Sequence, residues 1–254
     1  MKMRKSRVLE TMRAGKVAKS IKLNLCDPRI VEIAEMCGFD AVWLDMEHVP
    51  TDWRTIDEGI RAGKIYDMDT IVRVGKGSYS DFIRPLEADA SGLIIPHLMS
   101  LQEAKDIVKT TRFYPLGLRP VDGGNADGSY CLLDFNKYLQ EANKNRLICV
   151  QVEDVEVMAD LEQIAELDGI DMIFFGPGDY SQSLGTPGQW DNPELGRVRK
   201  AIADVCKKNN KFAGTVGGPG NYKELVDMGY SYINIGADVV GISTYFSNLL
   251  KECK

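Results

Sequence analysis

Short apolar runs alternate along the chain with longer amphipathic segments. Several runs are hydrophobic almost without a break, as in residues 92–96 (GLIIP) and 172–176 (MIFFG). An unbroken run is typical of a strand that is buried on both faces of a parallel sheet. The pattern predicts eight strands, at residues 20–25, 41–45, 70–74, 92–96, 147–152, 172–176, 212–216 and 232–235.

The segments between these runs have helical spacing. Ile30, Ile33 and Ala34 fall on one stripe of a predicted helix. Ser100 is a predicted N-cap, and Glu103 follows it three residues later, as in a capping box. The predicted helices span residues 29–36, 101–110, 155–165, 194–208, 221–228 and 239–251.

Eight strands, each followed by a helical or partly helical segment, match the repeat of a (β/α)₈ barrel. We therefore predict an α/β protein with one TIM-barrel domain over residues 1–254. A doubly wound open sheet is the alternative, but no G-x-G-x-x-G motif follows the first strand. Residues 115–130 are rich in glycine and polar residues, and we predict that they form a long active-site loop between the fourth and fifth strands.

Composition narrows the range of partners. The net charge is −6 and no long basic stripe is present, which argues against nucleic acid. No apolar run reaches the roughly 18 residues of a membrane helix, and the basic N-terminal segment lacks the apolar core of a secretory signal. The six cysteines form no C-x-x-C pair, and scattered free thiols favour a reducing compartment, so we expect a cytoplasmic protein.

Polar residues stand at the end of nearly every predicted strand, where barrel enzymes carry their active groups. This distribution fits a polar catalytic site better than a binding module with one hydrophobic groove. The candidates are Asn24, Asp27, Asp45, Glu47, His48, Arg73, His97, Gln151, Glu153, Asp154, Asp179, Thr215 and Asp238.

Glu153 and Asp179 follow successive strands. Two carboxylates brought together without a positive charge would repel each other and raise each other's pKa, and a divalent cation bound between them removes this repulsion. Carboxylates with water and substrate oxygens suit magnesium or manganese. The alternative is that each carboxylate only caps the helix after its strand.

His48 is one of two histidines, and imidazole is the usual general base near neutral pH. Asp45 lies three residues before it and is predicted to orient the ring. The alternative is a surface or packing histidine. His97 follows Pro96 and is interpreted as a loop histidine.

Arg73 ends the apolar run TIVRV, and its fork suits a carboxylate of the substrate or of a neighbouring side chain. Gly178 lies in a G-P-G run whose backbone N–H groups could face a carboxylate. A Schiff-base mechanism needs a lysine inside the barrel. Lys22 and Lys76 are the remaining candidates, and neither has the apolar, cation-rich setting that activates a lysine.

Several segments, taken in order, resemble the HpcH/HpaI aldolase family of metal-dependent, class II pyruvate aldolases. They are GFDAVWLDMEHVPTD, IVRV, EADASGLIIPHL, RFYPLGLRP, CVQVED and GPGDYS. The usual G-x-R-G of the loop reads Gly117–Leu118–Arg119–Pro120 here, a stretch expected near the aldehyde end of the substrate. This departure leaves the acceptor aldehyde open.

The resemblance implies a role for each matching residue. Glu153 and Asp179 would bind the divalent cation (Mg, Mn or Co), Arg73 and Gln151 would hold the oxo acid, and His48, oriented by Asp45, would move the proton. The implied substrate is a 4-hydroxy-2-oxo acid, such as a heptanedioate or a 2-keto-3-deoxy sugar acid.

The implied reaction is reversible cleavage of that acid to pyruvate and an aldehyde through a metal-stabilised enolate. The resemblance also implies a homohexamer whose C-terminal helix is exchanged between subunits. The alternatives are a citrate-synthase-like condensation or an oxo-acid decarboxylation on the same scaffold. A non-catalytic binding protein is a third possibility.

Overall fold

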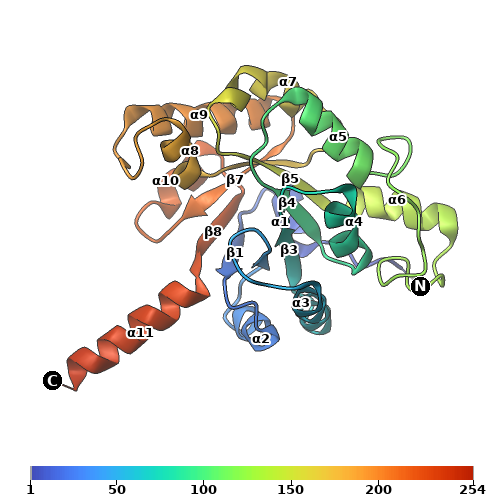
Figure 1. The fold of residues 1–254 in the computed structure, drawn as a ribbon, viewed down its shortest axis with the longest axis horizontal. Helices are drawn as coiled ribbons and strands as arrows, with labels where there is room; N and C mark the ends of the chain where they lie inside the picture. The colour runs from blue at the N-terminus through green and yellow to red at the C-terminus, as the bar shows by residue number, and fades with distance from the viewer. Residues whose placement is uncertain (1, 254) are drawn as a thin grey trace.

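Eight parallel strands close into a barrel in the order of the sequence, and β1 pairs with β8 to complete the ring (Figure 1). The computed structural model describes residues 2–253, so the two end residues of the predicted domain lie outside it. The (β/α)₈ prediction is confirmed. The strands are β1 (Ala18–Leu23), β2 (Ala41–Asp45), β3 (Asp69–Arg73), β4 (Gly92–Ile95), β5 (Leu147–Val152), β6 (Met172–Phe175), β7 (Phe212–Gly217) and β8 (Tyr232–Ala237).

Helices alternate with the strands and surround most of the barrel (Figure 1). Ser100 caps its helix as predicted, by accepting a hydrogen bond from the amide of Glu103. The segment predicted as one helix at 155–165 begins as a 3₁₀ turn. The helices are α1 (Arg7–Arg13), α2 (Pro28–Met36), α3 (Trp53–Ile65), α4 (Tyr79–Glu87), α5 (Leu101–Thr111), α6 (Phe135–Asn145), η1 (Glu156–Asp160), α7 (Leu161–Glu166), α8 (Pro177–Ser183), α9 (Pro193–Lys208), α10 (Tyr222–Met228) and α11 (Asp238–Glu252).

The inside of the barrel is packed with side chains and is closed at the end where the strands begin. Trp43 and Phe174 meet edge to face with ring centroids 5.4 Å apart. Burying each such ring stabilises the fold by about 2 kcal/mol. The carboxylate of Asp69 accepts hydrogen bonds from Ser6 Oγ (2.6 Å) and from the amide of Val8 (2.9 Å), which holds α1 under the barrel. The carboxyl ends of the strands therefore form the open end.

The prediction that residues 115–130 form an active-site loop is wrong within this chain. The amide of Asp127 donates to the carbonyl of Glu87 at the end of α4, and the amide of Arg119 donates to Arg112 after α5. Arg112 in turn donates to the carbonyl of Gly169, just before β6. These contacts place the loop beside the ends where strands begin, because it follows a helix rather than a strand.

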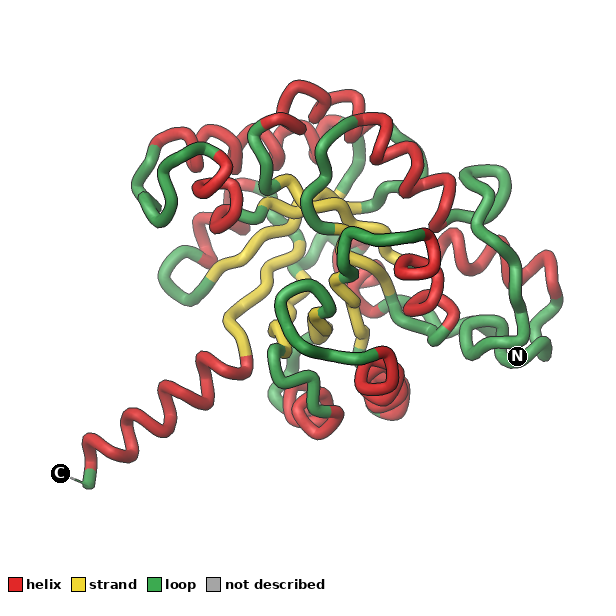
Figure 2. Tube along the Cα trace, in the orientation of Figure 1, coloured by secondary structure: helices red, strands yellow, loops and turns green. Residues whose placement is uncertain are grey.

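The C-terminal helix α11 extends away from the barrel (Figures 1 and 2). It contacts β1 and β8 near its first turn, and its remaining length carries exposed apolar side chains. Among them are Val240, Tyr245, Phe246 and Leu250. An isolated helix of this length is marginal in water without a packed face. Among the described residues, no helix combines the length and the apolar character needed to cross a membrane.

Candidate active site

Asp45 and Arg73 end neighbouring strands at the same level, since the register pairs them across β2 and β3. Arg73 donates from Nε to Asp45 Oδ1 (2.9 Å) and from Nη2 to Oδ2 (2.6 Å). Lys22 Nζ of β1 lies 2.7 Å from Oδ2. Burial would raise the pKa of the Asp45 carboxyl, but the bonds from Arg73 and Lys22 hold that pKa at about 2. Asp45 is therefore a buried anion that fixes the Arg73 fork.

The predicted Asp45–His48 pair is not formed. Asp45 binds Arg73, Lys22 and the amide of Glu47, and no bond joins it to His48 within residues 2–253. The His48 side chain is 52% exposed, and its Nε2 lies 3.4 Å from Glu47 Oε2. The reason is local: Asp45 still belongs to β2 and is buried, whereas His48 lies beyond the end of the strand.

Glu47 joins two parts of the site. Its Oε2 lies 3.0 Å from Arg73 Nη1, and its Oε1 lies 3.5 Å from His97 Nε2. The Arg73 guanidinium also stacks over the ring of Trp43, 4.8 Å from its centroid. Glu47 thus connects the arginine of β3 to the groups that follow β4 and β5.

Glu153 follows β5 and is almost fully buried. Its Oε1 accepts from the backbone amide of His97 (2.8 Å), and its Oε2 accepts from Gln151 Nε2 (3.0 Å). Burial raises the pKa of Glu153 to about 7, although the His97 amide and ring act in the opposite direction. The carboxylates of Glu47 and Asp179 raise it further. A buried carboxyl with this pKa is a frequent sign of a functional site.

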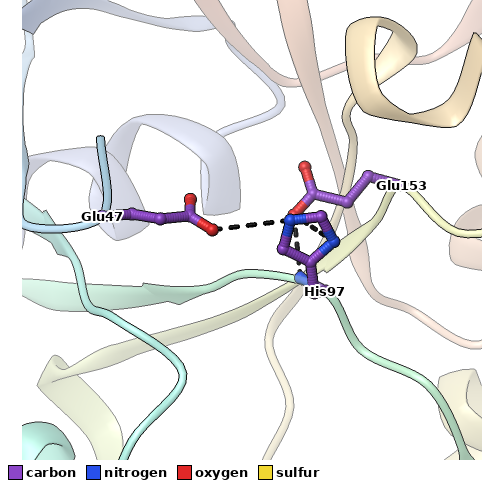
Figure 3. A group of neighbouring side chains, drawn as sticks. All are labelled: Glu47, His97 and Glu153. Atoms are coloured by element: carbon purple, nitrogen blue, oxygen red, sulfur yellow. Dashed lines mark hydrogen bonds and ion pairs between the residues drawn. The ribbon is translucent and has the colours of Figure 1, made fainter. Parts of the chain in front are cut away.

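His97 points into the same cluster, which the loop-histidine interpretation missed (Figure 3). Its Nδ1 lies 2.9 Å from Asp154 Oδ2, and its backbone has a positive φ of 49°. Burial would lower the pKa of the ring, but the Asp154 hydrogen bond and the charges of Glu153, Asp154 and Glu47 raise it overall. The sequence signal was the P-H pair directly after a buried strand, at the edge where catalytic groups gather.

Asp179 and Gly178 lie in the first turn of α8, directly after β6. Asp179 is exposed, and its negative charge is one of the causes of the raised pKa of Glu153. The acidic and histidine side chains that converge most closely are Glu47, His97 and Glu153, each with one ligand atom within 4.8 Å of the others. Asp179 stands outside that group.

These donors fit a divalent cation. They are carboxylate oxygens and one imidazole nitrogen, the ligand types that divalent ions prefer. The buried Oε1 of Gln151, next to Glu153, has no hydrogen-bond partner among the described residues. A bound cation would also relieve the repulsion among the carboxylates that surround Glu153.

Comparisons with known proteins point to one family. The model of the HpcH/HpaI aldolase/citrate lyase family matches residues 22–243. A hydroxypyruvate/pyruvate aldolase from Pseudomonas aeruginosa is 30% identical over 92% of this chain and 87% of its own length. A crystal structure of an HpcH/HpaI aldolase from Desulfitobacterium hafniense is 26% identical, with a TM-score of 0.91 over 97% of this chain and 96% of that one. The structure of citrate synthase SbnG is 27% identical, with a TM-score of 0.88 over 96% of both chains. The chain belongs to the HpcH/HpaI aldolase/citrate lyase family.

Proposed function

We propose that this chain is a metal-dependent aldolase that cleaves a 4-hydroxy-2-oxo acid reversibly to pyruvate and an aldehyde. The observation that carries the proposal is the continuous line of charged groups at the open end of the barrel. It runs from Asp45 through Arg73, Glu47 and His97 to Glu153. A preorganised site of this kind suits a reaction in which negative charge develops on an oxo acid.

Arg73 is suited to bind the carboxylate of the oxo acid. Three of its nitrogens already face Asp45 and Glu47, so the guanidinium is held in one orientation. Its five N–H groups exceed these contacts, which leaves donors for a substrate oxygen. Gln151 lies beside Glu153 and is proposed as a further substrate contact, as is the backbone of Gly178 in the first turn of α8.

Glu153 and Asp179 are proposed to hold the divalent cation. The cation would supply Lewis-acid polarisation of the keto group. Glu153 is oriented for this role from two sides, by the His97 amide and by the Gln151 amide. Its high pKa in the metal-free chain is the expected property of a ligand that waits for a positive charge.

His48 is proposed to move the proton at C3 of pyruvate or at the aldol hydroxyl. It is accessible to solvent and is adjacent to Glu47, so it can exchange protons with bulk water. Asp45 is a positioning residue for Arg73 in this proposal rather than the partner of His48.

The similarity to citrate synthase SbnG supports one alternative function, a condensation that uses the same enolate. An oxo-acid decarboxylation is the other. Both would use Arg73 and the cation in the same way, so the product distinguishes them from an aldolase.

We further propose a homo-oligomer, a hexamer by family resemblance, in which α11 packs on a neighbouring subunit. The apolar side chains along α11 support an exchange of this kind, as does an apolar groove beside its first turn. Ile21, Ile30, Ile33 and Phe39 line the groove. The whole chain would then act as one domain. All six cysteines are free within the described residues, which supports a cytoplasmic location.

The test is hydrogen exchange at C3 of pyruvate in deuterated water, followed by NMR, because this step needs no aldehyde. Wild-type protein with Mg²⁺, Mn²⁺ or Co²⁺ should catalyse exchange, and Glu153→Gln should not. A panel of aldehydes with pyruvate should then give 4-hydroxy-2-oxo acids. Full activity after chelation, or trapping of pyruvate on Lys22 by borohydride, would contradict the proposal. Carbon dioxide or a condensation product in place of an aldol would support the alternatives.

A further inference from the structure

His97 brings a nitrogen donor to the cluster around Glu153. It stands outside the pair of oxygen ligands that the family resemblance implies, and the proposed reaction does not use it. Its ring and its backbone amide both face the Glu153 carboxylate (Figure 3). A positive φ at a residue other than glycine costs about 1 to 2 kcal/mol. This conformation therefore has to be maintained by the surrounding contacts.

The hydrogen bond to Asp154 sets the free nitrogen of the ring. Asp154 Oδ2 lies 2.9 Å from His97 Nδ1, which assigns the proton to Nδ1 in the neutral ring. The lone pair is then on Nε2, the atom 3.5 Å from Glu47 Oε1. A carboxylate that binds one nitrogen of an imidazole while the other faces a cluster of anions is the usual arrangement behind a metal-bound histidine.

The spacing of the donors suits one ion. Two ligands that each lie about 2.1 Å from a tetrahedral ion are about 3.4 Å apart. His97 Nε2 and Glu47 Oε1 are 3.5 Å apart. Glu47, His97 and Glu153 each offer one ligand atom within 4.8 Å of the others, and the His97 ring lies 3.9 Å from Glu153 Oε1 at Nδ1. The buried Gln151 Oε1 beside Glu153 has no hydrogen-bond partner within residues 2–253. Polar atoms in this state are expected where a ligand is to bind.

We propose that His97 binds the divalent cation directly through Nε2, with Glu47 and Glu153 as oxygen donors, so that this site selects a transition metal over Mg²⁺. The selectivity follows from the donor set, because imidazole binds Zn²⁺ and Co²⁺ well whereas Mg²⁺ prefers oxygen ligands only. The inference rests on the proposed function in placing a cation at Glu153, and it adds His97 and Glu47 to the proposed ligand pair of Glu153 and Asp179.

The first experiment uses Mn²⁺ as the probe and electron spin echo envelope modulation to detect nitrogen bound to it. The chain has two histidines, His48 and His97, so labelling histidine with ¹⁵N marks only these rings. Untagged full-length protein should show ¹⁴N modulation that becomes ¹⁵N modulation on labelling. His97→Asn should abolish it, and asparagine tolerates the positive φ at this position. His48→Asn is the matched control and should retain it.

The second experiment measures metal affinity directly, by competition with a chelating dye. His97→Asn should weaken Zn²⁺ and Co²⁺ binding at least about tenfold and should change Mg²⁺ binding by less than about threefold. Circular dichroism of each variant shows that the barrel is intact.

The outcomes separate this inference from the proposed function. Tight Mn²⁺ binding without histidine modulation, or modulation lost in His48→Asn and kept in His97→Asn, overturns the role of His97 and leaves the aldolase proposal intact. Equal loss of Mg²⁺ and Zn²⁺ affinity in His97→Asn overturns the claimed selectivity. Metal-independent C3 exchange contradicts the proposed function even if His97 binds metal.

Discussion

The pKa of Glu153 gives a prediction about stability that needs no substrate. The carboxyl has an ordinary pKa of 4.5 and a pKa of about 7 in the folded, metal-free chain. Between these values the folded state keeps a proton that the unfolded state has lost. The tighter binding of this proton in the folded state therefore stabilises the fold fully below pH 4.5. That contribution to the free energy of unfolding is lost as the pH rises to about 7. At about 1.4 kcal/mol for each pKa unit, the loss is about 3 kcal/mol.

The variant Glu153→Gln should remove this loss, because glutamine keeps the shape of the side chain and carries no charge. Metal-free variant should be more stable than wild type by about 3 kcal/mol at pH 8 and by much less at pH 4.5. Urea denaturation followed by circular dichroism measures both values, at one fixed protein concentration because subunit association adds to stability. Glu166→Gln, a change at an exposed glutamate of α7, is the matched control and should follow wild type at every pH.

Divalent metal provides the second arm of this test. Addition of Mn²⁺ at pH 8 should stabilise wild type, since the ion neutralises the buried carboxylate of Glu153, and should stabilise Glu153→Gln much less. If wild type and Glu153→Gln differ by the same amount at pH 4.5 and at pH 8, the reasoning about the buried carboxyl is wrong.

Three further predictions concern the remaining parts of the site and the assembly. Arg73→Lys should lower kcat/KM at least 100-fold, about 3 kcal/mol, because a point charge cannot replace the fork that Asp45 holds; near-wild-type kinetics would make Arg73 only structural. Asp45→Asn should lower the free energy of unfolding at pH 7 by about 2 kcal/mol or more. The difference from wild type should shrink as the pH falls from about 4 to about 2, because the Asp45 carboxylate of wild type is then protonated and loses its charge. Denaturation at pH 7 and at pH 3 checks this. The double change Tyr245→Lys and Phe246→Lys on α11 should reduce the mass found by light scattering, and Ser247→Lys should not; an unchanged mass would show that α11 does not join subunits.

Much of the fold could be predicted because each strand is a short apolar run with a helical segment after it. The predicted and observed limits of β2 agree, as do those of β5. The loop at residues 115–130 failed as a prediction because glycine and polar residues look alike at either end of a barrel. Only its position after α5 places it at the end where strands begin.

The candidate site could also be predicted only in part from the sequence. The sequence by itself determined that acidic and basic groups gather at the carboxyl ends of strands, since strand ends are visible in the hydrophobic pattern. It could not determine their pairing, because pairs form across strands whose register depends on the closed barrel. Asp45 therefore meets Arg73 and not His48, three residues away. The position of His97 was likewise decided by the tertiary structure. Its positive φ and its hydrogen bond to Asp154, which follows the neighbouring strand, place the His97 ring beside Glu153.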